Sequence, residues 1–163
     1  MPIAINSLEY KCWHEVGHAT VCLHLGGEVE FIELIDGENA DGLARARCST
    51  TTTIRPKVAC GGFATEFFLL RNGHLPTIDE KVITQIIFRN ATKDREMFCE
   101  RTLDDKNGFE LEDDEAFMHM AVNEVAPIVK QYFHQMEQIV GELIKERKVE
   151  GSKVKAMLFT PQA

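Results

Sequence analysis

The sequence has 163 residues, of which 44% are hydrophobic and 27% charged, and its formal net charge is −8. This length and balance suit one globular domain with a sizeable core, so we expect residues 1–163 to form a single domain. An acidic chain repels phosphate backbones and anionic lipid surfaces, which argues against nucleic acid as a partner. No apolar run is long enough to cross a bilayer.

The five cysteines are widely spaced and include no CxxC pair. An odd number with this spacing is typical of free thiols in a reducing compartment rather than of a disulfide framework. The N-terminus, MPIAINSLEY, lacks the basic start and apolar core of a secretory signal. We therefore expect a cytoplasmic protein without an integral membrane segment.

The first element expected along the chain is a helix from Ser7 or Leu8 to Leu25. Ser7 can cap its start, and the Gly-Gly pair that follows can end it. Residues 29–35 then alternate between apolar and polar side chains, and residues 43–48 can pair with them. The loop between these segments, DGENADG, is rich in turn-forming residues, so the sequence predicts a β-hairpin here.

Two further helices are expected in the middle of the chain. One starts near residues 54–56, where Pro56 suits a first turn, and runs to Leu70. The other begins at Thr77, because Thr77 and Glu80 have the spacing of a capping box, and continues to about residue 101.

The C-terminal third is also helical in pattern over residues 113–148. A break is expected before Pro127, and Ser152 can cap a last short helix. The fold class predicted from these elements is mainly α, a single domain of about five to six helices with one small β-hairpin.

Residues 14–18 of the first helix are His-Glu-Val-Gly-His, the HExxH pattern. Two histidines four residues apart share one face of a helix, so both can reach one tetrahedral ion. Glu15 lies about 100° around the helix from His14, where it flanks the ion and can take a proton from bound water. The pattern predicts one zinc ion per chain, held by His14 and His18, with Glu15 as the catalytic base.

The composition of the helix supports this interpretation. From Cys12 to Leu25 the only formally charged side chain is Glu15, and a helix that is apolar on most sides is usually buried. Burying two imidazoles and a carboxylate without partners costs on the order of several kcal/mol. A metal with its water would satisfy all three groups, and a hydrogen-bonded core is the alternative.

A catalytic zinc site needs a third protein ligand and an open position. In the longer zinc pattern HExxHxxGxxH, the last histidine would be His24, but Val21 stands where that pattern has a helix-breaking glycine. His24 therefore lies about 240° around the helix from His18, and we exclude it as a ligand. Residue chemistry and distance along the chain leave four candidates open: Asp79, Glu80, Glu66 and His74.

At this point the sequence resembles the peptidase domain of the FtsH family, the membrane-anchored ATP-dependent zinc proteases. The similarity covers nearly the whole chain in the order of the family. It rests on residues 10–20 (YKCWHEVGHAT), 36–47 with a Gly-Leu-Ala turn, 58–67 (VACGGFATEF) and 140–158 (VGELIKERKVEGSKVKAML).

The resemblance implies that Asp79 is the third metal ligand, because an aspartate opens the family's helix after its Gly-Gly segment. It also implies that Glu66, which matches an acid of the Gly-Gly helix, supports the site from outside the ligand set. The sequence departs from the family at Phe63, where an arginine is usual, and in the residues that lead to Asp79.

In function, the resemblance implies a zinc-dependent metallopeptidase that hydrolyses peptide bonds by metal-activated water. The family's ATPase domain and its GxxxxGK motif have no counterpart in this sequence, so we expect action without ATP on flexible or unfolded polypeptides. The hairpin is expected either to hold substrate as an added strand or to belong to the core. One alternative is a non-catalytic zinc-binding adaptor or regulatory relative of a larger protease, and another is a helical interaction protein in which the HExxH pattern arises by chance. The partners considered besides a peptide substrate are another protein or further copies of the same protein.

Overall fold

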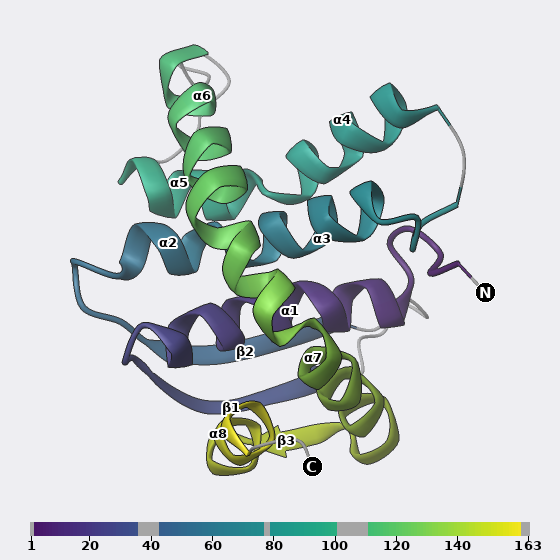
Figure 1. Cartoon of the computed structure of the whole chain (residues 1–163), viewed down its shortest axis with the longest axis vertical. Helices are drawn as coiled ribbons and strands as arrows, with labels where there is room; N and C mark the ends of the chain where they lie inside the picture. Colours follow the sequence, from purple (N-terminus) through teal and green to yellow (C-terminus); the bar gives the residue numbers. More distant parts are fainter. Residues whose placement is uncertain (1, 36–42, 77–78, 101–110, 161–163) are drawn as a thin grey trace.

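The computed structural model describes residues 2–35, 43–76, 79–100 and 111–160. These residues form a mainly helical structure with a small antiparallel sheet (Figure 1), which confirms the predicted fold class. In order along the sequence the elements are α1 (Leu8–His24), β1 (Glu28–Ile35), β2 (Leu43–Ser49), α2 (Arg55–Ala59), α3 (Gly61–Arg71), α4 (Glu80–Asn90), α5 (Thr92–Cys99), α6 (Leu111–Met120), the π-helical turn η1 (Ala121–Val125), α7 (Ala126–Glu146), β3 (Lys148–Glu150) and α8 (Gly151–Phe159).

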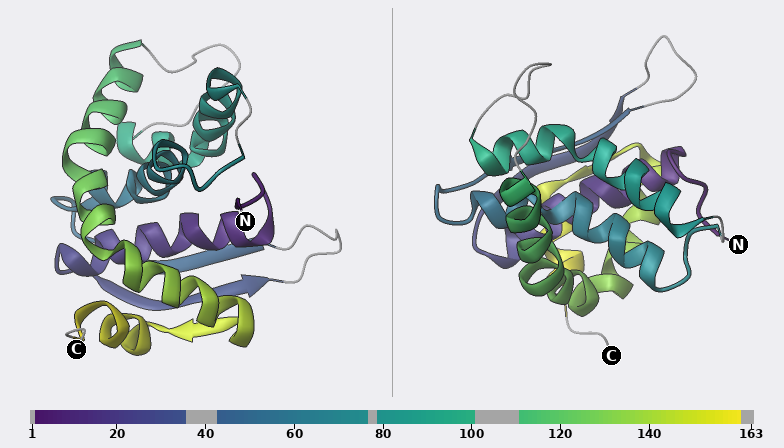
Figure 2. Two further views of the ribbon diagram at one scale, coloured as in Figure 1. Left: turned by 45° about the vertical axis from the view of Figure 1, so that its right-hand side comes forward. Right: turned by 90° about the horizontal axis from the view of Figure 1, so that it is seen from above.

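The helix α1 lies at the centre of the molecule. Ser7 caps its start as predicted, since the Ser7 hydroxyl accepts a hydrogen bond from the Tyr10 N–H at 3.2 Å. The sheet lies on one side of α1, and α3, α4 and α5 lie on the other, with α7 packed across it (Figure 2). Trp13, Val16 and Cys22 are almost fully buried, which confirms that α1 is enclosed on most sides.

Glycines allow α1 and α3 to cross at short range. A Cβ atom on Gly17 would lie 2.6 Å from the Gly61 carbonyl oxygen, and a Cβ on Gly61 would lie 2.9 Å from the Gly17 carbonyl oxygen. Protein interiors are close-packed, so a methyl group at either position would push the helices apart. The close crossing brings α3, and with it Glu66, against the histidine face of α1.

The sheet has the strand order β2-β1-β3, so β2 is an edge strand. The predicted hairpin is confirmed by antiparallel pairing of β1 with β2, in which Ile32 faces Ala46. The strand β3, which was not predicted, pairs with the other side of β1. The predicted turn over residues 36–42 lies outside the described residues.

The helix predicted from about residue 54 to Leu70 is two helices. Pro56 lies in the first turn of α2 as expected, and Cys60 separates α2 from α3. The end of α3 agrees with the prediction within one residue: Asn72 is its C-cap and Gly73 has a φ of +76°. A left-handed conformation after a helix is one that glycine adopts without strain.

The helix predicted from Thr77 to about residue 101 starts later and is interrupted at Ala91. Asp79 caps α4, and Thr77 lies outside the described residues. At the interruption the Thr92 hydroxyl donates to the Arg89 carbonyl at 2.8 Å, and the Arg95 side chain donates to the Phe88 carbonyl at 3.0 Å. Side-chain hydrogen bonds of this kind compete with the helix ladder. The result is a separate α5, which packs against α2.

The C-terminal region follows the prediction more closely. The disturbance expected before Pro127 is η1, which directly precedes α7. Proline lacks the N–H that a continuous helix requires, and π-helical turns occur at such interruptions. The last helix starts at Gly151 with Glu150 as its N-cap, so Ser152 lies inside α8 and does not cap it. None of the helices in the described ranges is long and apolar enough to cross a membrane.

Candidate metal centre

Three side chains from α1 and α5 converge on one point. His14 and His18 come from successive turns of α1, and Asp94 comes from the first turn of α5. The Asp94 Oδ2 atom lies 3.1 Å from His14 Nε2 and 3.2 Å from His18 Nε2, and the two Nε2 atoms are 3.1 Å apart. Within the described residues, this His14–His18–Asp94 cluster is the one group placed to hold a metal ion.

The spacing of the cluster fits a metal ion. A tetrahedral zinc ion with ligands at about 2.0–2.1 Å sets its ligand atoms about 3.3–3.4 Å apart. The three observed separations, 3.1, 3.1 and 3.2 Å, are slightly shorter than this. Two imidazole nitrogens and a carboxylate oxygen also form a donor set that zinc accepts, and three protein ligands leave a position for water or substrate.

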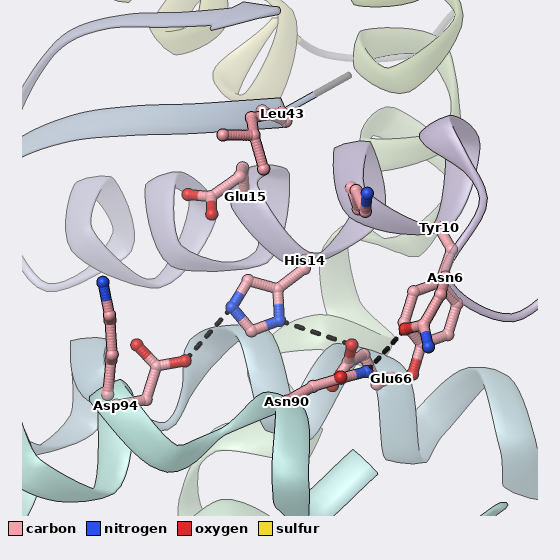
Figure 3. A pocket seen from close by; sticks show the side chains of 11 residues that line it. Asn6, Tyr10, His14, Glu15, Leu43, Glu66, Asn90 and Asp94 are labelled. Carbon is pink, nitrogen blue, oxygen red and sulfur yellow. Dashed lines mark hydrogen bonds and ion pairs between the residues drawn. The ribbon is translucent and has the colours of Figure 1, made fainter. Parts of the chain in front are cut away.

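The Nδ1 atom of each imidazole, on the side of the ring away from the cluster, has its own partner. His18 Nδ1 donates to the Val58 carbonyl oxygen at 2.7 Å, and His14 Nδ1 lies 3.5 Å from Glu66 Oε1. Figure 3 shows the His14 ring between Glu66 on one side and Asp94 on the other. Such contacts fix the ring orientation and leave Nε2 directed at the metal position. Glu66 thus lies where the sequence analysis expected a supporting residue, and it is only 1% exposed.

The charges of the cluster favour a cation between the rings. Burial opposes the charged form of His14, but Glu66 and Asp94 outweigh it and raise the pKa of His14 well above its ordinary value. Burial likewise opposes the charge on His18, and Asp94 raises the pKa of that ring. Burial would raise the pKa of Asp94, yet the two histidines hold it well below its usual range. A metal ion supplies the same positive charge when it displaces the ring protons.

Glu15 projects from α1 toward β2 and is not one of the three converging groups. Its Oε2 atom accepts a hydrogen bond from the Ala46 N–H of β2 at 3.0 Å. In Figure 3 its carboxylate lies between Leu43 of β2 and the His14 ring. This hydrogen bond holds the carboxylate beside the cluster without placing it among the ligands.

Two hollows lie along β2 beside the cluster, and together they are called the groove. One hollow of about 390 Å³ is lined by Leu43 and Ala44 at the start of β2, and this is the pocket drawn in Figure 3. A second hollow of about 220 Å³ is lined by Ala46 and residues further along the strand. Glu15 and Asp94 line both hollows, so the cluster stands between them.

The structure places Asp79, the expected third ligand, away from the two histidines. Asp79 is exposed at the N-cap of α4, where its Oδ1 atom accepts a hydrogen bond from the Lys81 N–H at 3.0 Å. Asp94 takes the place beside the histidines instead, 76 residues beyond His18. Sequence reasoning missed Asp94 because it treated residues 77–101 as one helix, whereas the interruption at Ala91 makes Asp94 a first-turn residue of a new helix.

The other candidates also lie apart from the cluster. Glu80 is exposed in the first turn of α4. The His74 ring packs against Phe133, with the ring centroids 5.0 Å apart. His24 Nδ1 forms a hydrogen bond with the Tyr132 hydroxyl at 2.9 Å. None of these three residues contributes an atom to the candidate metal centre.

Gly62 leaves the space that the His14 ring occupies. A Cβ atom at this position would overlap the ring atoms Cε1, Nε2 and Nδ1. We expect Gly62→Ala to displace the ring and weaken zinc binding by about tenfold or more, the scale seen when support of a ligand is lost. Zinc titration against a chromogenic chelator would measure the change.

A matched control for this substitution lies in α7. A Cβ on Gly141 would meet nothing within 4 Å, so Gly141→Ala should leave zinc binding unchanged. It should also raise the free energy of unfolding by about 0.5–1 kcal/mol, since alanine favours a helix over glycine. Equal zinc affinity in the two variants would contradict the role assigned to Gly62.

Comparison with known proteins assigns no family to this protein. No protein-family model matches the sequence, and no curated protein matches it at a significant level. The similarity to the FtsH peptidase domain therefore remains a resemblance carried by the sequence segments quoted above. What the protein does is inferred from the geometry of the cluster and the groove.

Proposed function

We propose that this protein is a zinc-dependent metallopeptidase that hydrolyses peptide bonds in flexible or unfolded polypeptides. The main support is the convergence of His14, His18 and Asp94, whose donor atoms lie within 3.2 Å of one another, with Glu15 beside them. Three ligands and an adjacent carboxylate are the parts that a hydrolytic zinc site requires. In this proposal Asp94 replaces Asp79 as the third ligand.

The proposed mechanism assigns a separate task to each residue. His14, His18 and Asp94 would hold the ion. Zinc, when bound, lowers the pKa of water toward about 7 and polarises the substrate carbonyl. Glu15 takes a proton from the attacking water and delivers it to the leaving nitrogen. The Ala46 N–H keeps one oxygen of Glu15 in place while the other is left for proton transfer.

The edge strand β2 offers a surface for an extended peptide. Ala44, Ala46 and Cys48 are half-buried along β2, and all three line the groove. Their side chains are small, so they leave room for a peptide backbone. An edge strand can accept a further strand through main-chain hydrogen bonds. These features favour a substrate-binding role for the hairpin over a purely structural one.

Metal removal tests this function directly. The purified protein is expected to contain about one zinc ion per chain by elemental analysis and to cleave an unstructured fluorogenic peptide. Ortho-phenanthroline should reduce the cleavage rate by about hundredfold or more, and added zinc should restore it. The meta isomer, which does not chelate, is the matched control and should have no effect.

Two outcomes would separate the alternatives. A protein that holds no zinc after zinc-replete, chelator-free preparation would contradict the peptidase proposal. A protein that holds zinc but cleaves no peptide would support the other hypothesis, a non-catalytic zinc-binding adaptor that acts with a larger protease.

A further inference from the structure

The two hollows that flank the cluster differ in the charge of their walls. The larger includes Lys11 of α1 and Lys93 of α5. The smaller contains no lysine or arginine among the described residues. Apart from groups of the cluster and Glu15, its walls are neutral: Ala46, Cys48, Thr50, Val58 and Met97.

The carboxylates of the larger hollow already have partners. Asp94 contacts both histidines of the cluster, and Glu66 lies against the His14 ring. Glu15 accepts the hydrogen bond from the Ala46 N–H. Lys93, by contrast, is exposed and makes no ion pair with any described carboxylate.

With a divalent ion bound in the cluster, the larger hollow would have a positive character. Among the described residues its walls carry two lysines and three carboxylates, and the ion would add two positive charges. The sum would then be one net positive charge beside the cluster. Both lysines belong to backbone positions near the cluster, because Lys93 precedes Asp94 and Lys11 lies about one helical turn before His14.

The geometry points to the larger hollow as a binding site for a carboxylate of the substrate, recognised by Lys93 with Lys11. This inference rests on the proposed peptidase function and names the chemistry of its substrate. The carboxylate would belong either to an Asp or Glu side chain next to the cleaved bond or to a substrate C-terminus close to that bond. The neutral walls of the smaller hollow should accept an uncharged side chain on the other side of the bond.

The exposure of the lysines sets how strongly an acidic peptide should be preferred over a neutral one. An ion pair between partly exposed groups contributes modestly, so we expect an acidic peptide to exceed its neutral counterpart by roughly three- to tenfold in kcat/KM. Salt screens such pairs, and the preference should decrease as the ionic strength rises. A preference based on shape alone would not depend on salt.

Quenched fluorescent peptides that differ at one position can test the inference. Glu, Gln and Lys are compared at each position around the cleaved bond, which mass spectrometry of the products locates. A second pair of neutral peptides, with a free or an amidated C-terminus, distinguishes the two sources of the carboxylate. We expect kcat/KM to be higher for the Glu peptide than for the Gln peptide at one position, or higher for the free C-terminus than for the amide.

Charge variants of Lys93 test whether the preference for acidic peptides comes from the larger hollow. Lys93→Gln should reduce the ratio of acidic to neutral kcat/KM toward one, and Lys93→Glu should reverse it in favour of the Lys peptide. Lys155→Gln is the matched control, because Lys155 is exposed on α8 and lines neither hollow. The control should leave the ratio unchanged.

Binding measurements keep this inference separate from the proposed function. Zinc-loaded Glu15→Gln protein is titrated with the labelled Glu and Gln peptides, and fluorescence anisotropy gives the affinities without turnover. Cleavage of neutral peptides without any charge preference would overturn the carboxylate site and leave the peptidase intact. If no peptide is cleaved, the peptidase proposal fails. Equal affinity of the Glu15→Gln protein for the Glu and Gln peptides would then overturn the carboxylate site as well.

Discussion

Asp94→Ala is expected to remove zinc from the protein and, with it, peptidase activity. Asp94 Oδ2 is the one carboxylate oxygen that lies within 3.2 Å of both His14 Nε2 and His18 Nε2 in the described residues. Without it, two imidazoles remain, and zinc affinity should fall by more than the 10–100-fold that is typical for loss of a group outside the ligand set. Elemental analysis and competition with a chromogenic chelator would measure this fall.

Asp79→Ala is the matched control, because it removes the same carboxyl group from another aspartate near the start of a helix. The exposed Asp79 caps α4, so its loss should cost about 0.5–2 kcal/mol of stability and leave zinc content unchanged. Circular dichroism would verify that both variants fold, and thermal melting would report the lost cap. Loss of zinc in Asp79→Ala but not in Asp94→Ala would overturn the ligand assignment.

Glu15→Gln is expected to reduce kcat by about 10²–10⁴, the usual contribution of a general acid–base group, while the zinc content stays the same. The amide cannot take a proton from water at neutral pH. Its oxygen can still accept the hydrogen bond from the Ala46 N–H, which holds Glu15 at 3.0 Å, so the local structure should persist. Steady-state kinetics together with elemental analysis would check both parts.

The control for this variant is Glu9→Gln, in the first turn of the same helix. Glu9 is exposed and lines neither hollow of the groove, so its replacement should leave kcat unchanged. Undiminished turnover in Glu15→Gln would contradict the assignment of Glu15 as the base. Loss of zinc in that variant would instead indicate that Glu15 helps to hold the ion.

The sequence by itself determined the parts of the molecule that depend on neighbours along the chain. The spacing of His14 and His18 matches the helical repeat, so a local pattern was enough to place both rings on one face of α1. Ser7 capped that helix as its residue type predicts. Alternation of side chains over residues 29–35 likewise predicted β1 and its pairing with β2.

The strand β3 was less accessible to sequence reasoning. It has only three residues, Lys148–Glu150, too few for an alternating pattern to stand out from the preceding helix. Its pairing with β1 depends on α7 returning the backbone to the far side of the sheet, where Val149 faces Ile32. Contacts between segments so far apart in sequence leave no local periodicity.

Only the tertiary structure decided which acid stands beside the histidines. Asp79 caps α4 and Asp94 lies in the first turn of α5, and nothing local to either residue distinguishes a cap from a candidate ligand. The difference comes from the interruption at Ala91, where side chains take over backbone hydrogen bonds, and from the packing of α5 against α2. These are competitions between groups that become neighbours only on folding, so the third member of the cluster had to come from the fold.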